Sequence, residues 1–137
     1  NLKAVWTGAQ AAAAIMKENG GGTIINISSA AAGNPSPFNG PYAVAKSGVN
    51  SLTQTLSSEL AAFNIRVNGV SPGPIPTEVF MEFLKLEEKD IPGLGERFQI
   101  PLGRVGTPED ISPAVVYLAS DASRWMTGQT ILIKGGA

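Results

Sequence analysis

The chain has 137 residues, 43 % of them hydrophobic, which is enough for one domain with a real core. Ten basic and eleven acidic residues give a net charge of −1 with no basic stripe, so no nucleic-acid partner is expected. Cysteine and histidine are absent, which excludes disulfides, thiol nucleophiles, Ser-His-Asp triads and histidine or thiolate metal sites. No metal site is therefore predicted, and tyrosine, lysine and carboxylates remain as proton carriers. Apolar runs too short for a membrane span and the lack of a signal-peptide pattern predict a cytoplasmic protein with no membrane partner.

The first half of the chain predicts a helix, a strand, a loop and a second helix. An alanine-rich segment with helical spacing covers residues 1–18 and ends at a run of glycines. Residues 23–28 are short, apolar and β-branched, as in a buried parallel strand. Three prolines and two glycines make residues 30–41 a loop. An apolar stripe then predicts a helix over residues 42–63, with Asn64 as a left-handed end residue.

The second half continues the alternation of strands and helices. Residues 65–70 read as a strand, followed by the sharp turn Ser-Pro-Gly-Pro at 71–74. Residues 77–100 form a looser region that we expect to be helical in part. A threonine cap, a proline and two acids then begin a helix that runs from residue 107 to about 119, and residues 130–134 form a terminal strand. This order predicts an α/β fold with right-handed crossovers and a parallel sheet.

Three side chains carry the chemical signal. Tyr42 and Lys46 are four residues apart, so a helix presents the phenol and the ammonium on one face. Ser29 follows the first predicted strand, and ligands of open parallel sheets bind at the carboxyl ends of strands. A nearby positive charge is expected to lower the pKa of the Tyr42 phenol, which suits it to exchange a proton with an alcohol or carbonyl oxygen.

A resemblance to a known family rests on motifs that span essentially the whole chain. The chain resembles the carboxyl-terminal part of the short-chain dehydrogenase/reductase family, in the branch similar to 3-oxoacyl-carrier-protein reductases and bacterial hydroxysteroid dehydrogenases. The matching stretches are NLKAVW, GGGTIINISS, PYAVAKSGV, NIRVNGVSPGPIPT, PLGRVGTPEDI and YLASDASRWMTGQTILIKGG. The resemblance implies a Rossmann-like doubly wound parallel sheet of which only the carboxyl-terminal half is present. It makes residues 1–137 a single partial domain, the catalytic and substrate-lid half of a dehydrogenase.

The same resemblance implies roles for individual residues in an enzyme that interconverts a secondary alcohol and a ketone with NAD or NADP. Tyr42 is then the general acid/base, Lys46 binds the nicotinamide ribose and holds the tyrosine pKa down, and Ser29 polarises the substrate oxygen. Asn1 matches the helix asparagine that steadies a water-linked proton path. The cofactor is bordered by four further residues of the turn after the second strand, Pro72, Gly73, Ile75 and Thr77. A turn glycine and a helix-capping threonine explain Gly73 and Thr77 equally well.

Two departures from the family pattern have consequences. The glycine-rich phosphate loop of the family is absent from the sequence, as is the Asn-Asn-Ala-Gly segment. We therefore expect a fragment or incomplete chain whose first strand exposes an apolar edge and which alone neither binds the adenosine half of a dinucleotide nor turns over. Lys134 stands before Gly-Gly where the family usually has Asp, and no consequence is assigned to it.

Several alternatives stay open at this stage. A truncated or degenerate chain that serves only in oligomer assembly is the alternative to an enzyme. For an enzyme, a 3-oxoacyl thioester competes with a steroid-like or cyclic ketone as the small-molecule substrate, and Arg97 and Arg104 are candidates for carrier recognition. Apolar residues of a substrate lid, or of the core, occupy positions 80–84. The resemblance also implies a homotetramer or dimer packed through the helices at 1–18 and 42–63.

Overall fold

Three parallel strands form the sheet of the computed structural model, which describes residues 1–35, 37 and 39–137. They are β1 (Gly22–Ile27), β2 (Ile65–Pro72) and β3 (Thr130–Ile133), in the spatial order β1-β2-β3. Ile27 pairs with Val70 across β1 and β2, and Val70 pairs with Ile131 across β2 and β3. The predicted parallel α/β sheet is confirmed, with β2 two residues longer than the predicted strand. Ser36 and Phe38, within the predicted loop, lie outside the described residues.

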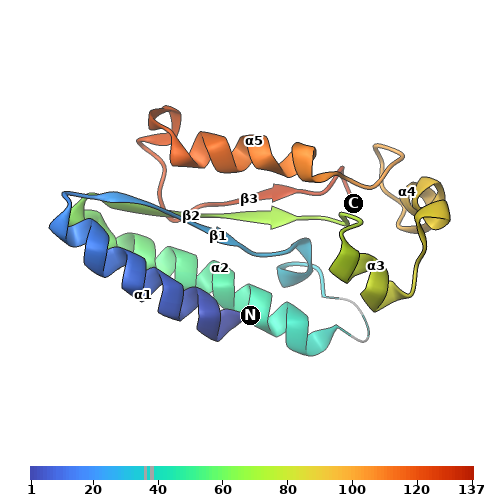
Figure 1. The fold of residues 1–137 in the computed structure, drawn as a ribbon, viewed down its shortest axis with the longest axis horizontal. Coiled ribbons are helices and arrows are strands. Elements are labelled where there is room, and N and C mark those ends of the chain that lie inside the picture. The colour runs from blue at the N-terminus through green and yellow to red at the C-terminus, as the bar shows by residue number, and fades with distance from the viewer. Residues whose placement is uncertain (36, 38) are drawn as a thin grey trace.

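Helices cover both faces of this sheet (Figure 1). The long helices α1 (Leu2–Glu18) and α2 (Gly40–Leu60) lie on one face, and α5 (Pro108–Ala119) lies on the other. Strand alternation explains the division, because successive side chains point to opposite faces. Ile65 and Val67 of β2 pack in one cluster with side chains of α1 and α2, whereas Arg66 between them donates to the carbonyl of Leu118 in α5.

A core of aliphatic side chains joins α1 and α2 to the sheet. Val67 is completely buried, and methionine and leucine side chains that are partly buried pack around the cluster. The stripe predicted on the second helix contributes directly to it. The buried members of this core are Ala9, Ala13, Ile24, Leu56, Leu60, Ile65 and Val67.

The second long helix differs from its prediction at both ends. It begins at Gly40, two residues early, because Pro41 fits the first turn of a helix and needs no hydrogen-bonded N–H there. Its last predicted turn is a separate 3-10 helix, η2 (Ala61–Phe63). Asn64 closes it with φ of 58°, so the predicted left-handed end residue is confirmed.

Polar side chains of β2 form hydrogen bonds with the segment 126–129, which precedes β3. The buried Asn68 amide donates to the carbonyl of Met126 at 2.8 Å and accepts from the N–H of Gln129 at 3.0 Å. Arg66 donates to the carbonyls of Leu118 and Met126. These contacts align residues 126–129 so that β3 continues the sheet.

Short helices replace the looser region after β2. They are α3 (Glu78–Leu84), the 3-10 helix η3 (Glu88–Gly93) and α4 (Leu94–Arg97). The partly helical region predicted at 77–100 thus contains two separate α-helices, and the helix predicted at 107–119 is α5. Leu94, Ile100 and Val105 form a second buried cluster that holds them together. The remaining 3-10 helices are η1 (Ala30–Ala32), inside the predicted loop, and η4 (Asp121–Ser123). Among the described residues, no helix combines the length and hydropathy needed to cross a membrane.

Candidate functional site

Three of the segments that carry predicted site residues lie at the carboxyl ends of β1 and β2 (Figure 1). Ser29 follows β1 and begins η1, and Tyr42 lies in the first turn of α2. The turn that starts at Gly73 leaves the neighbouring strand at the same end of the sheet. Parallel strands therefore bring three distant segments of the sequence to one edge.

Lys46 connects the helix to the strand. Its Nζ lies 5.8 Å from the centroid of the Tyr42 ring and donates to the carbonyl of Ile27 at 2.9 Å. This confirms that the phenol and the ammonium share a helix face, and the Ile27 bond fixes the ammonium at the end of β1. The lysine has two further N–H donors for a ligand. Tyr42 is 42 % exposed.

The two serines after β1 have different surroundings. Ser28 is 3 % exposed, and its hydroxyl donates to the backbone carbonyl of Lys46 at 3.0 Å, which ties α2 to the strand. Ser29 is half-buried, and its oxygen accepts from the N–H of Ala31 at 3.2 Å. That contact leaves the Ser29 O–H free to donate to another oxygen. The environment of Ser29, not that of Ser28, suits a substrate contact.

The turn after β2 is held by backbone contacts. The N–H of Gly73 donates to the carbonyl of Ile133 at 2.7 Å, and a Cβ at this glycine would lie 2.7 Å from the Cα of Lys134. Close approach of β3, not a left-handed turn, therefore requires the glycine. Thr77 precedes α3 in the capping position but makes no side-chain cap, and its side chain is exposed. The helix-capping explanation of this hydroxyl is not supported.

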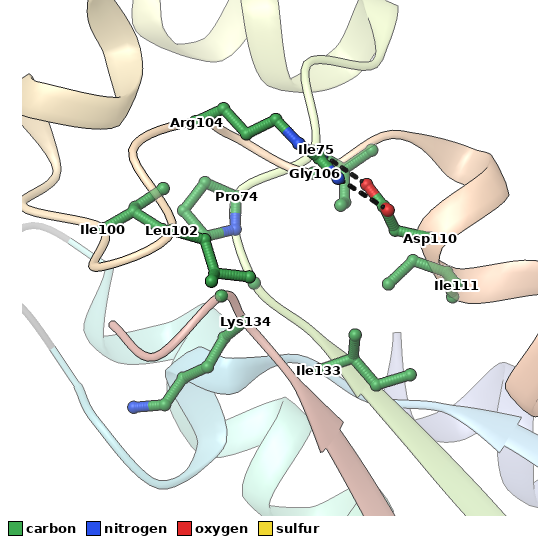
Figure 2. A pocket seen from close by; sticks show the side chains of 12 residues that line it. Pro74, Ile75, Ile100, Leu102, Arg104, Gly106, Asp110, Ile111, Ile133 and Lys134 are labelled. Atoms are coloured by element: carbon green, nitrogen blue, oxygen red, sulfur yellow. Dashed lines mark hydrogen bonds and ion pairs between the residues drawn. The ribbon is translucent and has the colours of Figure 1, made fainter.

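A pocket of about 140 Å³ lies beside this turn, between the ends of β2 and β3 and the loop that precedes α5 (Figure 2). Pro74, Ile75, Ile100, Leu102 and Ile133 supply most of its apolar wall. Pro72, Ser29, Tyr42 and Lys46 do not line it. The pocket is a neighbour of the candidate site and shares Gly73 and Ile75 with the predicted cofactor border.

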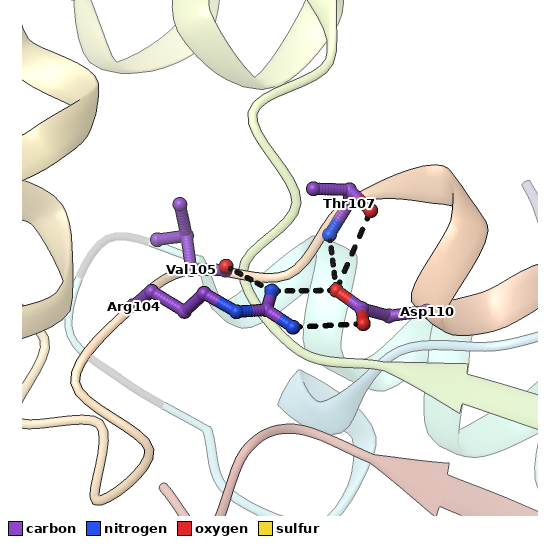
Figure 3. A network of polar contacts seen from close by, with 4 residues as sticks. All are labelled: Arg104, Val105, Thr107 and Asp110. Atoms are coloured by element: carbon purple, nitrogen blue, oxygen red, sulfur yellow. Dashed lines mark hydrogen bonds and ion pairs between the residues drawn. The ribbon is translucent and has the colours of Figure 1, made fainter.

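Arg104 at the rim of this pocket is bound to Asp110 (Figure 3). Its two terminal nitrogens donate to the two carboxylate oxygens at 2.7 and 2.9 Å. Asp110 also accepts from the N–H of Thr107 at 2.8 Å, which completes a capping box at the start of α5. The Arg104 guanidinium and the Thr107 N–H hold the pKa of the Asp110 carboxyl well below its usual range.

Asn1 stands apart from the other site residues in its contacts. It is exposed and occupies the position before α1, where its carbonyl accepts from the N–H of Val5 at 3.4 Å. Its side chain makes no capping hydrogen bond. No contact links it to Tyr42 or Lys46 in the described structure.

Two contacts were missed by reasoning from sequence. The bond from Lys46 to Ile27 and the bond from Ser28 to the Lys46 carbonyl both join residues far apart in the chain. The sequence signal for such a contact is the pair of adjacent serines after a buried strand, since either hydroxyl could bond to the neighbouring helix. Nothing in the spacing showed which serine faces the helix.

Comparison with known proteins decides the family. A family profile described as Enoyl-(Acyl carrier protein) reductase matches residues 1–137. The chain belongs to the short-chain dehydrogenase/reductase family. A 3alpha-hydroxysteroid dehydrogenase of Mediterraneibacter gnavus is 42 % identical over 137 residues, which are 100 % of this chain and 53 % of that protein. A 3-oxoacyl-[acyl-carrier-protein] reductase of Thermotoga maritima is 44 % identical over 138 residues, covering 99 % of this chain and 53 % of that one.

Solved structures of this family have the same fold. A 7 alpha-hydroxysteroid dehydrogenase complexed with NADH and 7-oxo glycochenodeoxycholic acid matches with a TM-score of 0.88 and 33 % identity, over 100 % of this chain and 52 % of that one. A gluconate 5-dehydrogenase from Burkholderia cenocepacia in complex with NADP and tartrate matches with a TM-score of 0.86 and 36 % identity, over 96 % and 51 %. The chain thus spans about half the length of the relatives it matches, and the Rossmann-type α/β fold is confirmed.

Proposed function

We propose that the protein carrying this chain is an oxidoreductase that interconverts a secondary alcohol and a ketone with NAD or NADP, and that Tyr42 is its general acid/base. The observation that carries the proposal is the position of Lys46, whose ammonium is fixed by Ile27 and lies 5.8 Å from the Tyr42 ring. A phenol with an ammonium group beside it, at the carboxyl edge of a parallel sheet, is the arrangement this chemistry needs.

The residues present fit a nicotinamide cofactor. Lys46 has N–H donors left for ribose hydroxyls, and the exposed Thr77 hydroxyl makes no cap to α3. In this proposal Pro72, Gly73 and Ile75 border the nicotinamide, and Thr77 contacts its carboxamide or the phosphates. Two solved relatives are complexes with NADH and with NADP, which supports either cofactor.

The bound nicotinamide would supply or accept the hydride, and the side chains would manage the charge on the substrate oxygen. During reduction that oxygen becomes negative, and the Ser29 and Tyr42 hydroxyls stabilise it by donating hydrogen bonds. Tyr42 then gives its proton to the oxygen. Lys46 favours the resulting phenolate by its charge, and Asn1 is proposed to steady the path by which the proton is replaced.

Membership of the family is also the basis for proposals about the domain organisation and the oligomeric state. Residues 1–137 are proposed to be part of one domain, the half that carries the catalytic residues and a substrate lid. We propose a homodimer or homotetramer formed through α1 and α2, whose facing sides form an apolar groove with Leu2, Trp6 and Leu52 in its wall. The cytoplasmic location stays a prediction.

Removal of one hydroxyl tests the catalytic proposal. Tyr42→Phe in the native protein is expected to lower kcat by roughly 10²-fold or more, since general acid–base catalysis contributes about that much. The matched control is Tyr117→Phe, because Tyr117 is the other tyrosine of the chain, is also 42 % exposed and lies on α5. Initial rates of NADH and NADPH oxidation with a panel of ketones give the measurement.

The outcome also separates the enzyme from a chain that serves only in assembly. Full activity of Tyr42→Phe would refute the role of the phenol. Absence of hydride transfer in the unchanged native protein, with every ketone and both cofactors, would favour the assembly role instead.

A further inference from the structure

The side chain of Lys134 leaves the end of β3 on the face of the sheet that α2 covers. Figure 2 shows Ile133 on the side of Ile111, which belongs to α5, and Lys134 directed to the opposite side, away from Arg104. A Cβ at Gly73 would lie 2.7 Å from both the Cα and the Cβ of Lys134. The lysine therefore stands beside the turn that is proposed to border the nicotinamide, and its ammonium points away from the apolar wall of the small pocket.

No acid of the chain neutralises this ammonium. The described residues form two ion pairs, one between positions 87 and 89 and one between Arg104 and Asp110, and Lys134 belongs to neither. Its ammonium has no hydrogen-bond partner among the same residues. All eleven acids are among them, because the two positions outside the description hold serine and phenylalanine. A positive charge without a partner is thus held at the end of β3.

Two other cations near this end of the sheet are also without an ion pair in the described structure. Lys85 follows α3 and Arg97 ends α4, and the side chains of both are exposed. Lys134 is half-buried. Because solvent and salt screen an exposed charge more than a partly buried one, Lys134 is the best placed of the three to hold an anion.

Lys134 and the proposed catalytic pair are anchored at different strands of one sheet edge. The Lys46 ammonium is bound to Ile27 at the end of β1, whereas Lys134 follows β3. Strand β2 lies between β1 and β3, and neighbouring strands are about 4.8 Å apart, so the two lysines are anchored roughly 10 Å apart. A molecule whose carbonyl lies at Tyr42 and whose chain crosses the end of β2 brings its far end to Lys134.

From this placement we infer that the substrate is a ketone or secondary alcohol with a carboxylate roughly 10 Å from the reacting carbon, and that the ammonium of Lys134 binds that carboxylate. The inference rests on the proposed function, because it names the substrate class of the same site. Lys134 determines specificity by holding the end of the substrate that is remote from Tyr42, and it takes no part in proton transfer. The contact weakens with salt, so the preference for an acid is strongest at low ionic strength.

The test compares 9-oxodecanoate with its methyl ester, which carries the same ketone on the same chain without the charge. Binding of each to the native protein is measured by isothermal titration calorimetry, and kcat and KM are measured with NADH and NADPH at several salt concentrations. At low salt we expect the acid to bind roughly tenfold more tightly and to have a KM lower by the same factor, since a hydrogen bond between charged groups contributes about that much. The difference should narrow as the salt concentration rises.

Substitutions at Lys134 form the second arm. Lys134→Met keeps a long side chain and removes the charge, so the advantage of the acid over the ester is expected to fall from roughly tenfold to less than twofold, through KM. Lys134→Arg is expected to retain the advantage, and Lys134→Asp to reverse it. Lys85→Met is the matched control, because it removes an exposed lysine after α3, and it is expected to leave the advantage unchanged.

Two results would assign the lysine to a phosphate and overturn the inference. The first is a rise in KM for NADH or NADPH in Lys134→Met while the preference for the acid is intact, which would place the lysine at the cofactor. The second is weaker binding of acetoacetyl-coenzyme A, but not of 9-oxodecanoate, by the same variant. We expect Lys134→Met to change the binding of acetoacetyl-coenzyme A less than twofold.

The binding measurements separate this inference from the proposed function. Equal affinity for acid and ester, including no binding of either, overturns the inference, as does a loss of preference in Lys85→Met and not in Lys134→Met. Tighter binding of the acid that Lys134→Met abolishes, without hydride transfer to any ketone, would leave the carboxylate site standing and defeat the proposed oxidoreductase.

Discussion

The adjacent hydroxyl groups of Ser28 and Ser29 have different hydrogen-bond partners and therefore different roles. Ser28 and Ser29 differ by one position, yet one donates to the backbone of α2 and the other faces the loop beside the site. The backbone stays extended just after β1, with φ of −162° and ψ of 151° at Ser29, and an extended backbone directs successive side chains to opposite sides. Spacing to Tyr42 and family register favour Ser29 as the substrate contact, and the greater exposure of Ser29 supports this prediction.

Alanine substitutions at these two positions are expected to have opposite signatures. Ser29→Ala removes a hydrogen bond to the developing oxyanion, so kcat falls roughly 10²-fold while the unfolding temperature changes little. Ser28→Ala breaks a buried bond to the Lys46 carbonyl, so it lowers the free energy of unfolding by about 1 kcal/mol and leaves kcat within a few-fold. Steady-state kinetics and urea unfolding of both variants provide the check. A loss of kcat confined to Ser28→Ala would exchange the two assignments.

At the scale of elements, periodicity predicted most of what the structure contains. The helices at 1–18, 42–63 and 107–119 and all three strands are present, with ends shifted by at most three residues. The individual short helices within residues 77–97 could not be predicted, because they are held by a buried cluster of Leu94, Ile100 and Val105 and not by local propensity. The reason for Gly73 was also missed, since it depends on the approach of β3 from sixty residues away.

Helix α5 starts with a capping box whose stability depends on pH. The pKa of Asp110 is lowered in the folded state by Arg104 and Thr107, whereas an unfolded Asp titrates near ~3.9. The ionised form is therefore favoured by folding, and its contribution is present above about pH 4 and is lost as the pH falls toward the folded pKa. Exposure of the pair to solvent reduces the effect, because water and salt screen it.

Asp110→Asn is expected to lower the unfolding temperature by a few degrees at pH 7, and the difference from the unchanged protein should shrink as the pH falls below about 4. Calorimetric scans between pH 3 and pH 7 measure this difference. Glu109→Gln is the matched control, as Glu109 is an exposed acid in the same helical turn. A constant difference across this range would mean that the Asp110 charge does not stabilise α5.

At the scale of the whole molecule, the exposed apolar residues mark surfaces that the described residues leave uncovered. Ile27, 45 % exposed at the end of β1, belongs to the edge strand of the sheet, as the sequence predicted. Leu2 and Trp6, 38 % and 40 % exposed, line the groove between α1 and α2. Gly48 lets the helices approach there, since a Cβ would lie 2.8 Å from a methyl carbon of Leu2. Apolar grooves of this kind are typical of contacts between subunits.

Trp6→Glu should therefore weaken the proposed assembly through α1 and α2. In the assembly, a carboxylate in that groove would be buried without a partner. We therefore expect the variant to form smaller species than the unchanged tetramer or dimer, with a dissociation constant at least tenfold higher. Size-exclusion chromatography with light scattering, over a range of protein concentrations, measures the shift. Trp125→Glu is the control, because Trp125 is the other tryptophan and is 99 % exposed after η4. Dissociation caused by Trp125→Glu but not by Trp6→Glu would move the interface to the α5 side of the sheet.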